Sequence, residues 1–259
     1  MAQQTQVSRV ADYYRRWLKQ FPTFTALSNA SASEVLRAWS GLGYNSRALR
    51  LHQLAKTVSK QFRSQLPHDS VALQALPGIG RYTANAICCF AFDMRVPVVD
   101  VNIRRILTRW TRSILTSAEQ LPENEVWRIA ETLLPAKHSH EWNQALMDFG
   151  AMVCTARNPQ CAECPVSKYC ASAFAPAFLQ KVTKKKRSEP SWKGVPRRLY
   201  RGRILKMLHH HSFSATDIAA SLWTHPSRQD INWINSLMLA MHRDGLVSVR
   251  GNSFRIVGS

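Results

Sequence analysis

Four cysteines lie close together in the sequence and form the pattern C-x6-C-x2-C-x5-C at Cys154, Cys161, Cys164 and Cys170. At this density, cysteines of a cytosolic chain bind metal far more often than they form disulfides. A ribbon-type zinc site usually has two C-x-x-C pairs, whereas this cluster contains only one, Cys161 and Cys164. The pattern therefore predicts a metal centre held by four thiolates and leaves zinc open as one occupant.

The sequence LPGIGRYTANAI at 76–87 is a second chemical motif. Gly78 and Gly80 lie between two helical patterns, where they allow a tight turn. The turn brings backbone N–H groups to the start of the second helix, and such groups can bind a phosphate oxygen. A bare G-x-G pattern is weak, because many helix–helix turns use glycine for geometry alone. In a strongly basic chain it predicts a helix-hairpin-helix that holds a DNA phosphate at Gly78, Ile79 and Gly80 without reading sequence.

Asp100 stands directly ahead of a predicted helix in VPVVDVNIRRILTRW. Its simplest role is an N-cap. A carboxylate at a helix N-terminus is also favoured in its ionised form, which suits a group that faces a developing positive charge. The two roles are compatible with each other.

The charge of the chain points to a polyanionic partner. Its 35 Lys and Arg residues against 16 Asp and Glu residues give a formal net charge of +19. The cations are spread along the whole sequence and mixed with aromatic residues, which favours nucleic acid over a membrane surface; a merely basic surface is the alternative. The sequence has no apolar run long enough to cross a bilayer and no secretory signal, so we expect a cytoplasmic, nucleoid-associated protein.

The elements that must position these residues are helical up to about residue 175. Cys88 and Cys89, in the apolar run AICCFAF, are expected in the core. Apolar residues at three- and four-residue spacing predict helices over 5–20, 33–40, 46–63, 69–75, 81–92, 102–115, 124–133 and 141–151.

A basic, proline-containing stretch then predicts a linker over 176–198. Helices are expected at 199–209, at 215–223 with a capping box from Ser214 and Asp217, and at 230–243. A hairpin is expected around Gly251-Asn252. This layout is that of a winged helix, a module that commonly binds DNA but also serves for protein contacts.

Taken together, LPGIGRYTANAI, VVDVN and the four cysteines resemble the helix-hairpin-helix DNA glycosylases of the endonuclease III superfamily, from Met1 to about residue 175. Four further stretches resemble the adenine DNA glycosylase branch: AQQTQV, FPTFTALSNAS, WSGLGYNSRALRLH and WNQALMDFGAMVCT. The resemblance implies a mostly α fold of two helical lobes with a [4Fe–4S] cluster loop, here followed by the winged-helix-like domain. We expect four parts: a lobe with the hairpin at 1–110, a cluster lobe at 111–175, the linker at 176–198 and the C-terminal domain at 199–259.

The resemblance also implies residue roles. Asp100 would stabilise the oxocarbenium ion formed when a flipped base leaves its sugar, with Asn102 placing the carboxylate. Gln3, Gln4 and Tyr44 match residues that wedge into the duplex and contact the base left behind. The four cysteines would be the thiolate ligands of the [4Fe–4S] cluster.

Tyr82 occupies the position at which strand-cutting members of the superfamily carry a lysine. A phenol cannot form a Schiff base with the sugar, so we expect a monofunctional glycosylase. Tyrosine occurs here both in adenine glycosylases and in a branch that removes thymine or uracil from mispairs with guanine. The stretches AQQTQV and GLGYN favour adenine.

Two departures from the pattern bear on function. Adenine glycosylases commonly end in a domain that reads 8-oxoguanine, whereas a winged helix is expected here. The residue that matches Met1 follows a catalytic glutamate by two positions in the family, so the printed sequence is expected to be a shortened, weakly active form. The leading hypothesis is a monomeric N-glycosylase that removes adenine from A:G or A:8-oxoguanine mispairs in double-stranded DNA. The alternatives are a thymine or uracil glycosylase and a non-catalytic iron–sulfur DNA-binding protein.

Overall fold

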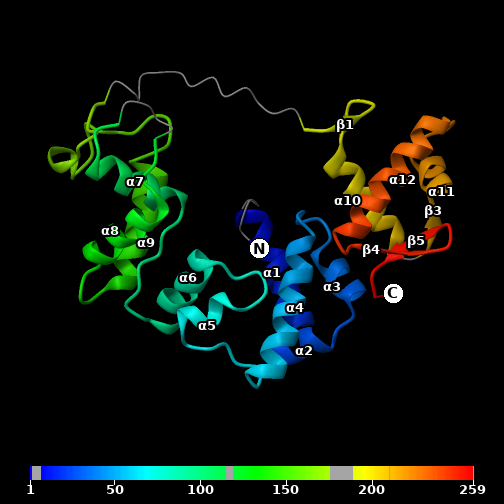
Figure 1. Cartoon of the computed structure of the whole chain (residues 1–259), viewed down its shortest axis with the longest axis horizontal. Helices are drawn as coiled ribbons and strands as arrows, with labels where there is room; N and C mark the ends of the chain where they lie inside the picture. The colour runs from blue at the N-terminus through cyan, green and yellow to red at the C-terminus, as the bar shows by residue number, and fades with distance from the viewer. Residues whose placement is uncertain (2–6, 115–118, 176–188, 210, 259) are drawn as a thin grey trace. The chain divides into compact units, whose positions relative to one another are not determined.

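The computed structural model describes residues 1, 7–114, 119–175, 189–209 and 211–258. They group into two compact units (Figure 1). Unit 1 comprises Met1–Leu66, Leu76–Gly78 and Arg187–Ser259, and unit 2 comprises Pro67–Ala75 and Ile79–Lys186. The predicted mostly α fold is confirmed, and the described strands all lie in the C-terminal part. The grouping differs from the four consecutive parts expected from the sequence, because the C-terminal elements share a core with the first four helices.

The first part of unit 1 consists of α1 (Val7–Gln20), α2 (Phe24–Asn29), α3 (Ala32–Trp39) and α4 (Ser46–Gln61). The α3 helix begins with a capping box in which the side chains of Ser31 and Glu34 bond each other's backbone N–H. The Trp17 and Trp39 rings meet edge to face at 5.5 Å and join α1 to α3. Helix α2, which is only six residues long and is capped by Thr23, was not predicted from the sequence.

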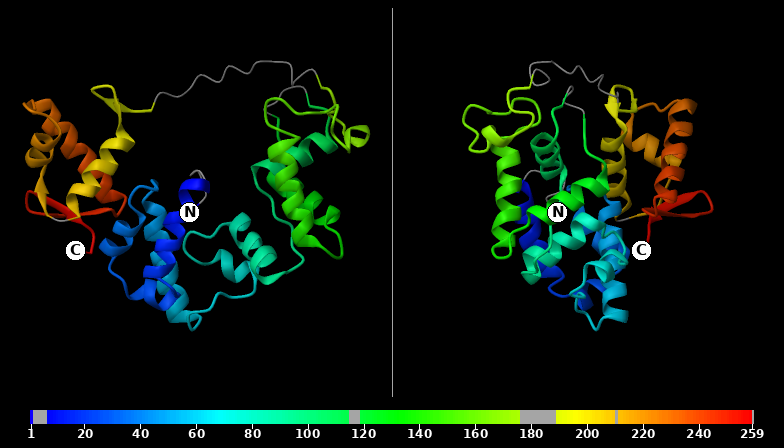
Figure 2. Two further views of the ribbon diagram at one scale, coloured as in Figure 1. Left: turned by 180° about the vertical axis from the view of Figure 1, so that it is seen from behind. Right: turned by 60° about the vertical axis from the view of Figure 1, so that its left-hand side comes forward.

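Unit 2 contains α5 (Ser70–Gln74), α6 (Arg81–Phe92), α7 (Val101–Thr111), α8 (Glu123–Leu133), α9 (Ser139–Met152) and the short 3-10 helix η1 (Ser167–Tyr169). The α7 helix packs against α8 and α9, and Figure 2 shows these helices from two further directions. Their shared core consists of Val99, Ile103, Leu107, Leu121, Val126, Trp127, Ala130 and Leu146. The described helix α7 ends at Thr111 rather than at 115, because Ser172 bonds the carbonyl of Arg112 and the N–H of Ile114 and holds this segment extended.

The C-terminal part of unit 1 contains α10 (Arg197–Leu208), α11 (Ala215–Leu222) and α12 (Arg228–Arg243). The expected hairpin is present as β4 (Val247–Arg250) and β5 (Ser253–Ile256), and β3 (Phe213–Ser214) adds a third strand in the order β3-β5-β4. The capping box of Ser214 and Asp217 is confirmed. The helix order and the sheet have the layout of a winged helix.

The end of the expected linker is a correction. Residues 176–188 lie outside the described part of the chain, but β1 (Ser191–Trp192) and β2 (Val195–Pro196) form an antiparallel hairpin. The hairpin is anchored by the buried carboxylate of Asp230, which accepts from Trp192 Nε1 and Lys193 Nζ at 2.8 Å each. This stretch is basic and contains prolines, and its bonds to Asp230 join residues far apart in the chain, so the sequence did not predict the hairpin.

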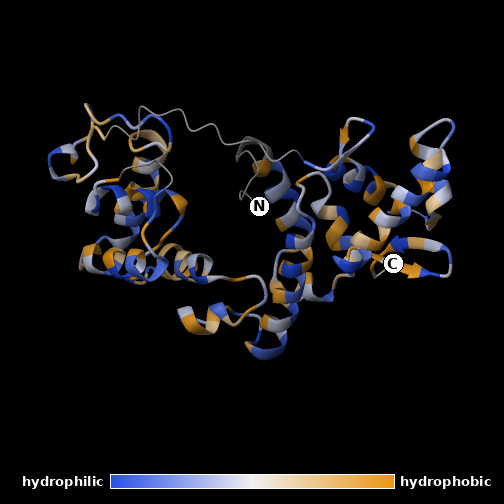
Figure 3. Cartoon of the chain, turned by 45° about the horizontal axis from the view of Figure 1, so that its top comes forward, coloured by the Kyte–Doolittle hydropathy of each residue, from blue (hydrophilic) through white to orange (hydrophobic). Residues whose placement is uncertain are grey.

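One cluster of buried apolar side chains runs through unit 1, from α1–α4 into the C-terminal helices. Gly258 lies against Ala32, and Gly245 lies near Leu49, where the two parts meet. Figure 3 shows helices that carry both hydrophobic and hydrophilic stretches, as expected for helices with one buried face. Within the described residues, no helix combines the length and the apolar character that a membrane span requires.

Candidate functional site

The glycine-rich turn leads into the N-terminus of α6. Gly78 has a φ of +81°, which L side chains rarely adopt, and a Cβ there would lie 3.1 Å from the Cβ of Arg50. Gly80 is the exposed N-cap of α6, where no side chain of the described residues accepts a capping bond, and a Cβ at this position would meet none of their atoms within 4 Å. The first turn of α6 therefore has no side-chain cap, an arrangement that suits an anion.

Asp100 is the N-cap of α7, as the simplest reading of the sequence predicts. One carboxylate oxygen, Oδ1, accepts from the backbone N–H groups of Asn102 and Ile103 at 2.8 and 2.7 Å. The other, Oδ2, accepts from the Asn102 side-chain amide at 3.0 Å. These three hydrogen bonds fix the direction of the carboxylate at the N-terminus of α7.

Two buried asparagines hold the extended segment that leads to Asp100. Asn143 Oδ1 accepts from the N–H of Val98 at 2.9 Å, and its Nδ2 donates to the carbonyl of Val96 at 3.1 Å. Asn85 donates to the carbonyl of Pro97 at 2.8 Å. Neither asparagine was predicted from the sequence to have a role, because each bonds to backbone far away in the chain.

Tyr82 lies in the first turn of α6, close enough to Asp100 for the two groups to interact electrostatically. Burial raises the pKa of the Tyr82 phenol, and the charge of Asp100 raises it further. The phenol is thus held in its protonated form near the carboxylate. The residue remains 37% exposed, so part of it is open to a ligand.

Arg105 connects Asn102 to the cysteine loop, a link that was not predicted from the sequence. Its guanidinium donates to Asn102 Oδ1 at 3.0 Å, to the carbonyl of Cys154 at 3.0 Å and to the carbonyl of Gly150 at 2.6 Å. A continuous chain of hydrogen bonds therefore runs from the first thiolate residue to Asp100. The one local signal was the spacing of Asn102 and Arg105, which places them on the same face of α7.

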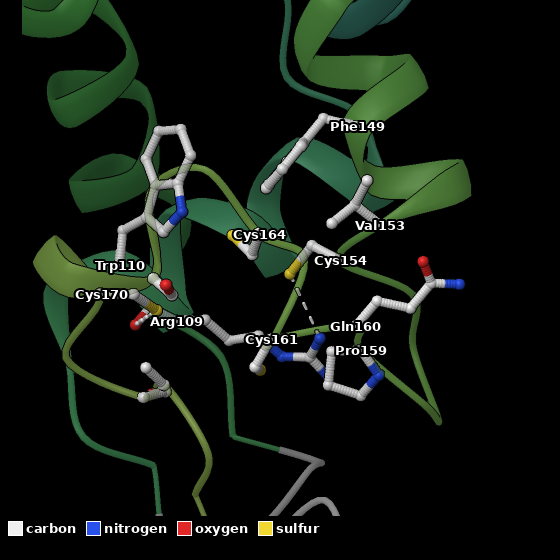
Figure 4. Close-up of a pocket in the computed structure, with 13 residues that line it drawn as sticks. Arg109, Trp110, Phe149, Val153, Cys154, Pro159, Gln160, Cys161, Cys164 and Cys170 are labelled. Atoms are coloured by element: carbon white, nitrogen blue, oxygen red, sulfur yellow. Dashed lines mark hydrogen bonds between the residues drawn. The ribbon is translucent and has the colours of Figure 1, made fainter.

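The four cysteines line one pocket together with Trp110, Phe149 and Val153 (Figure 4). All four are free thiols. Arg109 is 2% exposed and donates to the Cys154 sulfur at 3.4 Å and to the carbonyls of Thr155 and Ala156 at 2.7 and 3.0 Å. The buried guanidinium therefore fixes the first thiolate and the turn that follows it.

The donor set of this pocket fits an iron–sulfur cluster. Its four ligands are soft thiolates, which such clusters require. Burial raises the pKa of the Cys170 thiol, and the nearby thiols of the other three cysteines raise it further, so the sulfurs share one environment. Among the described residues, no group of three or more His, Cys, Asp or Glu side chains is spaced to hold a single metal ion.

Tyr44 lies in unit 1, in the segment between α3 and α4, and is 62% exposed. Its φ of 48° is in the left-handed region, an uncommon conformation for a bulky residue. The predicted residues Gln3 and Gln4 lie outside the described part of the chain. The structure thus brings Asp100, Asn102 and Tyr82 together within unit 2 and places Tyr44 in unit 1.

This fold and these sites define a class of protein. Residues 1–132 match the family model of the HhH-GPD superfamily base excision DNA repair protein, and residues 154–170 match the iron-sulfur binding domain of endonuclease III. The chain belongs to the HhH-GPD superfamily, and its four-cysteine loop is an iron–sulfur loop.

The chain is also similar to individual proteins of this kind. The chain is 35% identical to the adenine DNA glycosylase of Mycolicibacterium smegmatis over 250 residues, which is 95% of this chain and 81% of that protein. It is 42% identical over 171 residues to the adenine DNA glycosylase of Mus musculus, covering 66% of this chain but only 33% of that protein. A solved thermostable thymine-DNA glycosylase is 32% identical with a TM-score of 0.60, covering 66% of this chain and 78% of that one. A solved endonuclease III–DNA complex is 23% identical with a TM-score of 0.56 and supports the fold.

Proposed function

We propose that this protein is a DNA N-glycosylase that removes adenine from mispairs with guanine or 8-oxoguanine. The relatives that cover 95% and 66% of the chain are adenine DNA glycosylases. The observation that carries the proposal is the carboxylate of Asp100, which is fixed by three hydrogen bonds at the start of α7 next to an exposed phenol.

In the proposed reaction, a flipped deoxyadenosine places its C1′ in front of Asp100. As the bond from C1′ to the base breaks, positive charge develops on the sugar, and the carboxylate stabilises it electrostatically. Asn102 keeps the carboxylate in place and Arg105 keeps Asn102 in place. The departing adenine keeps the electron pair of the broken bond and takes up a proton from solvent, and water adds to C1′ and releases a proton to solvent, which leaves an abasic site. Tyr82 offers no amine for a Schiff base, so the strand remains intact.

Two further groups hold the substrate and the loop. The start of α6, after Gly80, binds a phosphate through backbone N–H groups. Cys154, Cys161, Cys164 and Cys170 hold the [4Fe–4S] cluster, which when bound cross-links the loop that Arg105 and Arg109 contact. Tyr44 and the terminal Gln3 and Gln4 contact the duplex where the base has left. The protein acts as a monomer on double-stranded DNA of the nucleoid.

The test compares labelled duplexes that contain A:8-oxoguanine, A:G, T:G and U:G mispairs, each treated with alkali after incubation to cut abasic sites. We expect cutting at the two adenine mispairs and none without alkali. Cutting only at T:G or U:G would instead support the alternative that the 32% identity to a thymine-DNA glycosylase suggests. Tight binding without any cutting would favour a non-catalytic DNA-binding protein. Light scattering of the free protein checks the monomeric state.

A further inference from the structure

A groove of about 950 Å³ lies within unit 1, between two segments that are far apart in the sequence. One wall is the segment between α3 and α4, and the other is a face of the C-terminal helix α10. The residues that line it include Ser40–Ser46 on the first wall and Arg198, Arg201, Gly202, Arg203 and His209 on the second. The hydrogen-bond network around Asp100 belongs to unit 2, so the groove is a different surface.

The first wall presents an aromatic ring on a constrained backbone. Tyr44 is exposed and has a left-handed φ, a conformation that costs free energy and is often found at binding sites. Trp39 Nε1 donates to the carbonyl of Gly43 at 3.0 Å, and the Arg47 guanidinium lies 5.6 Å from the Tyr44 ring. The ring is therefore held at the rim of the groove, where it can stack on a base or sugar.

The second wall is cationic. Arg198 forms an ion pair with Glu189, and Arg201 forms one with Asp244. Arg203 is exposed and, within the described part of the chain, has no carboxylate partner. Three arginines thus line the groove against a single acidic residue, Glu189.

Gly202 is an independent indication that a ligand can approach the backbone of α10 closely. It lies at an exposed position in the interior of α10, and a Cβ there would meet no atom of the described residues within 4 Å. Glycine in a helix interior lowers helix stability relative to alanine, and packing against the described part of the chain does not require it here. A bare backbone at this point lets a ligand approach the helix closely.

We propose that this groove binds the sugar–phosphate backbone of duplex DNA, so that the C-terminal domain holds DNA through α10. The identification of the ligand as DNA rests on the proposed function. The location of the binding surface is inferred from the arginines of α10, from Tyr44 and from Gly202. The α12 helix, which follows α11 as a recognition helix would, offers less charge: Arg228 lies at its start and Arg243 at its end, and its exposed residues between them include Asn232, Asn235 and Ser236.

The first experiment compares Arg203→Ala with Arg243→Ala, which removes the same cation from α12. The affinity for a short, undamaged, fluorescein-labelled duplex is measured by anisotropy between about 50 and 200 mM salt. We expect Arg203→Ala to reduce the slope of log affinity against log salt by about one unit and Arg243→Ala to leave it unchanged. An unchanged slope for Arg203→Ala, or a loss for Arg243→Ala alone, overturns the proposal.

The second experiment fills the groove without removing charge. Gly202→Leu should weaken duplex binding while the thermal midpoint stays equal or rises, because leucine is a better helix former than glycine. Asn235→Leu is its control, since Asn235 is exposed on α12, carries no charge and does not line the groove. Parent-like binding by Gly202→Leu overturns the proposal. Because the probe contains no mispair, a failure of adenine removal would leave both results unaffected.

Discussion

The hydrogen bonds from Arg105 through Asn102 to Asp100 have a fixed direction, which makes Asp100→Asn an informative substitution. A guanidinium can only donate, so Asn102 turns its Oδ1 to Arg105 and its Nδ2 to Asp100, at 3.0 Å in both cases. The Oδ1 atom of Asp100 already accepts from two backbone N–H groups. An amide at position 100 must therefore turn its own NH₂ group toward the NH₂ group of Asn102.

Two losses of different kind follow from this geometry. The helix cap survives, because asparagine caps about as well as aspartate. The NH₂ groups at positions 100 and 102 then face each other, so one of these donors has no acceptor, which destabilises the fold by about 1–3 kcal/mol. The lost negative charge should slow base removal by about 10²–10³, or about 2.7–4 kcal/mol of barrier.

A double variant separates the two losses. With Asp100→Asn and Asn102→Asp combined, the carboxylate at position 102 accepts both from Arg105 and from the new amide at position 100. The direction of every hydrogen bond is then satisfied again, but the charge no longer stands at the position of Asp100. We expect the stability to recover most of its loss while base removal stays as slow as in the single variant.

The assays are urea unfolding for stability, single-turnover adenine release for rate, and binding to a duplex that carries a cationic pyrrolidine in place of the sugar. The pyrrolidine imitates the charge of the oxocarbenium ion, so its affinity should fall in both variants while the affinity for an ordinary duplex changes little. Recovery of adenine release or of pyrrolidine affinity in the double variant would refute the reasoning. It would mean that Asp100 acts on stability alone.

Three other substitutions test neighbouring parts of the structure. Cys164→Ser should lose iron and the broad visible absorbance of a thiolate-bound cluster, together with local stability; a colourless parent protein with one zinc per chain would contradict the iron–sulfur assignment. Arg105→Met should slow adenine release and loosen the cluster loop, because it removes three hydrogen bonds. Its control is Arg104→Met, which removes one bond to the Leu121 carbonyl and should leave the rate unchanged. Equal rates of adenine release in the two variants would count against a positioning role for Arg105. The Lys193 ammonium, with donors from Ser227 and Trp192, holds the pKa of Asp230 well below its usual range. This stabilisation is present above the ordinary aspartate pKa of about 3.9 and is lost as the pH falls below it, so Asp230→Asn should lower stability at pH 7 and flatten its acid dependence in urea unfolding; a parallel acid dependence in both proteins would exclude Asp230 as the cause.

Features that depend on residues close together in the chain were predicted from the sequence alone. The range of α6 and the positions of most other helices follow from apolar spacing, and the caps at Asp100 and Ser214 follow from side chains that bond N–H groups two or three residues away. The four-cysteine pattern and the glycine turn are local in the same sense. The resemblance to glycosylases also rests on such short stretches, and the HhH-GPD match confirms it.

Features that depend on contacts between distant segments were decided only by the tertiary structure. Arg105 and Cys154 are 49 positions apart, and Trp192 and Asp230 are 38 apart, so no local pattern pairs them. The early end of α7, the strand β3 and the hairpin β1–β2 arise in the same way, because a partner far away in the chain outweighs local preference. The groove of Tyr44 and Arg203 joins the segment before α4 to α10. Neither segment carries a sequence pattern that predicts a groove, and only the packing of unit 1 brings the two segments face to face.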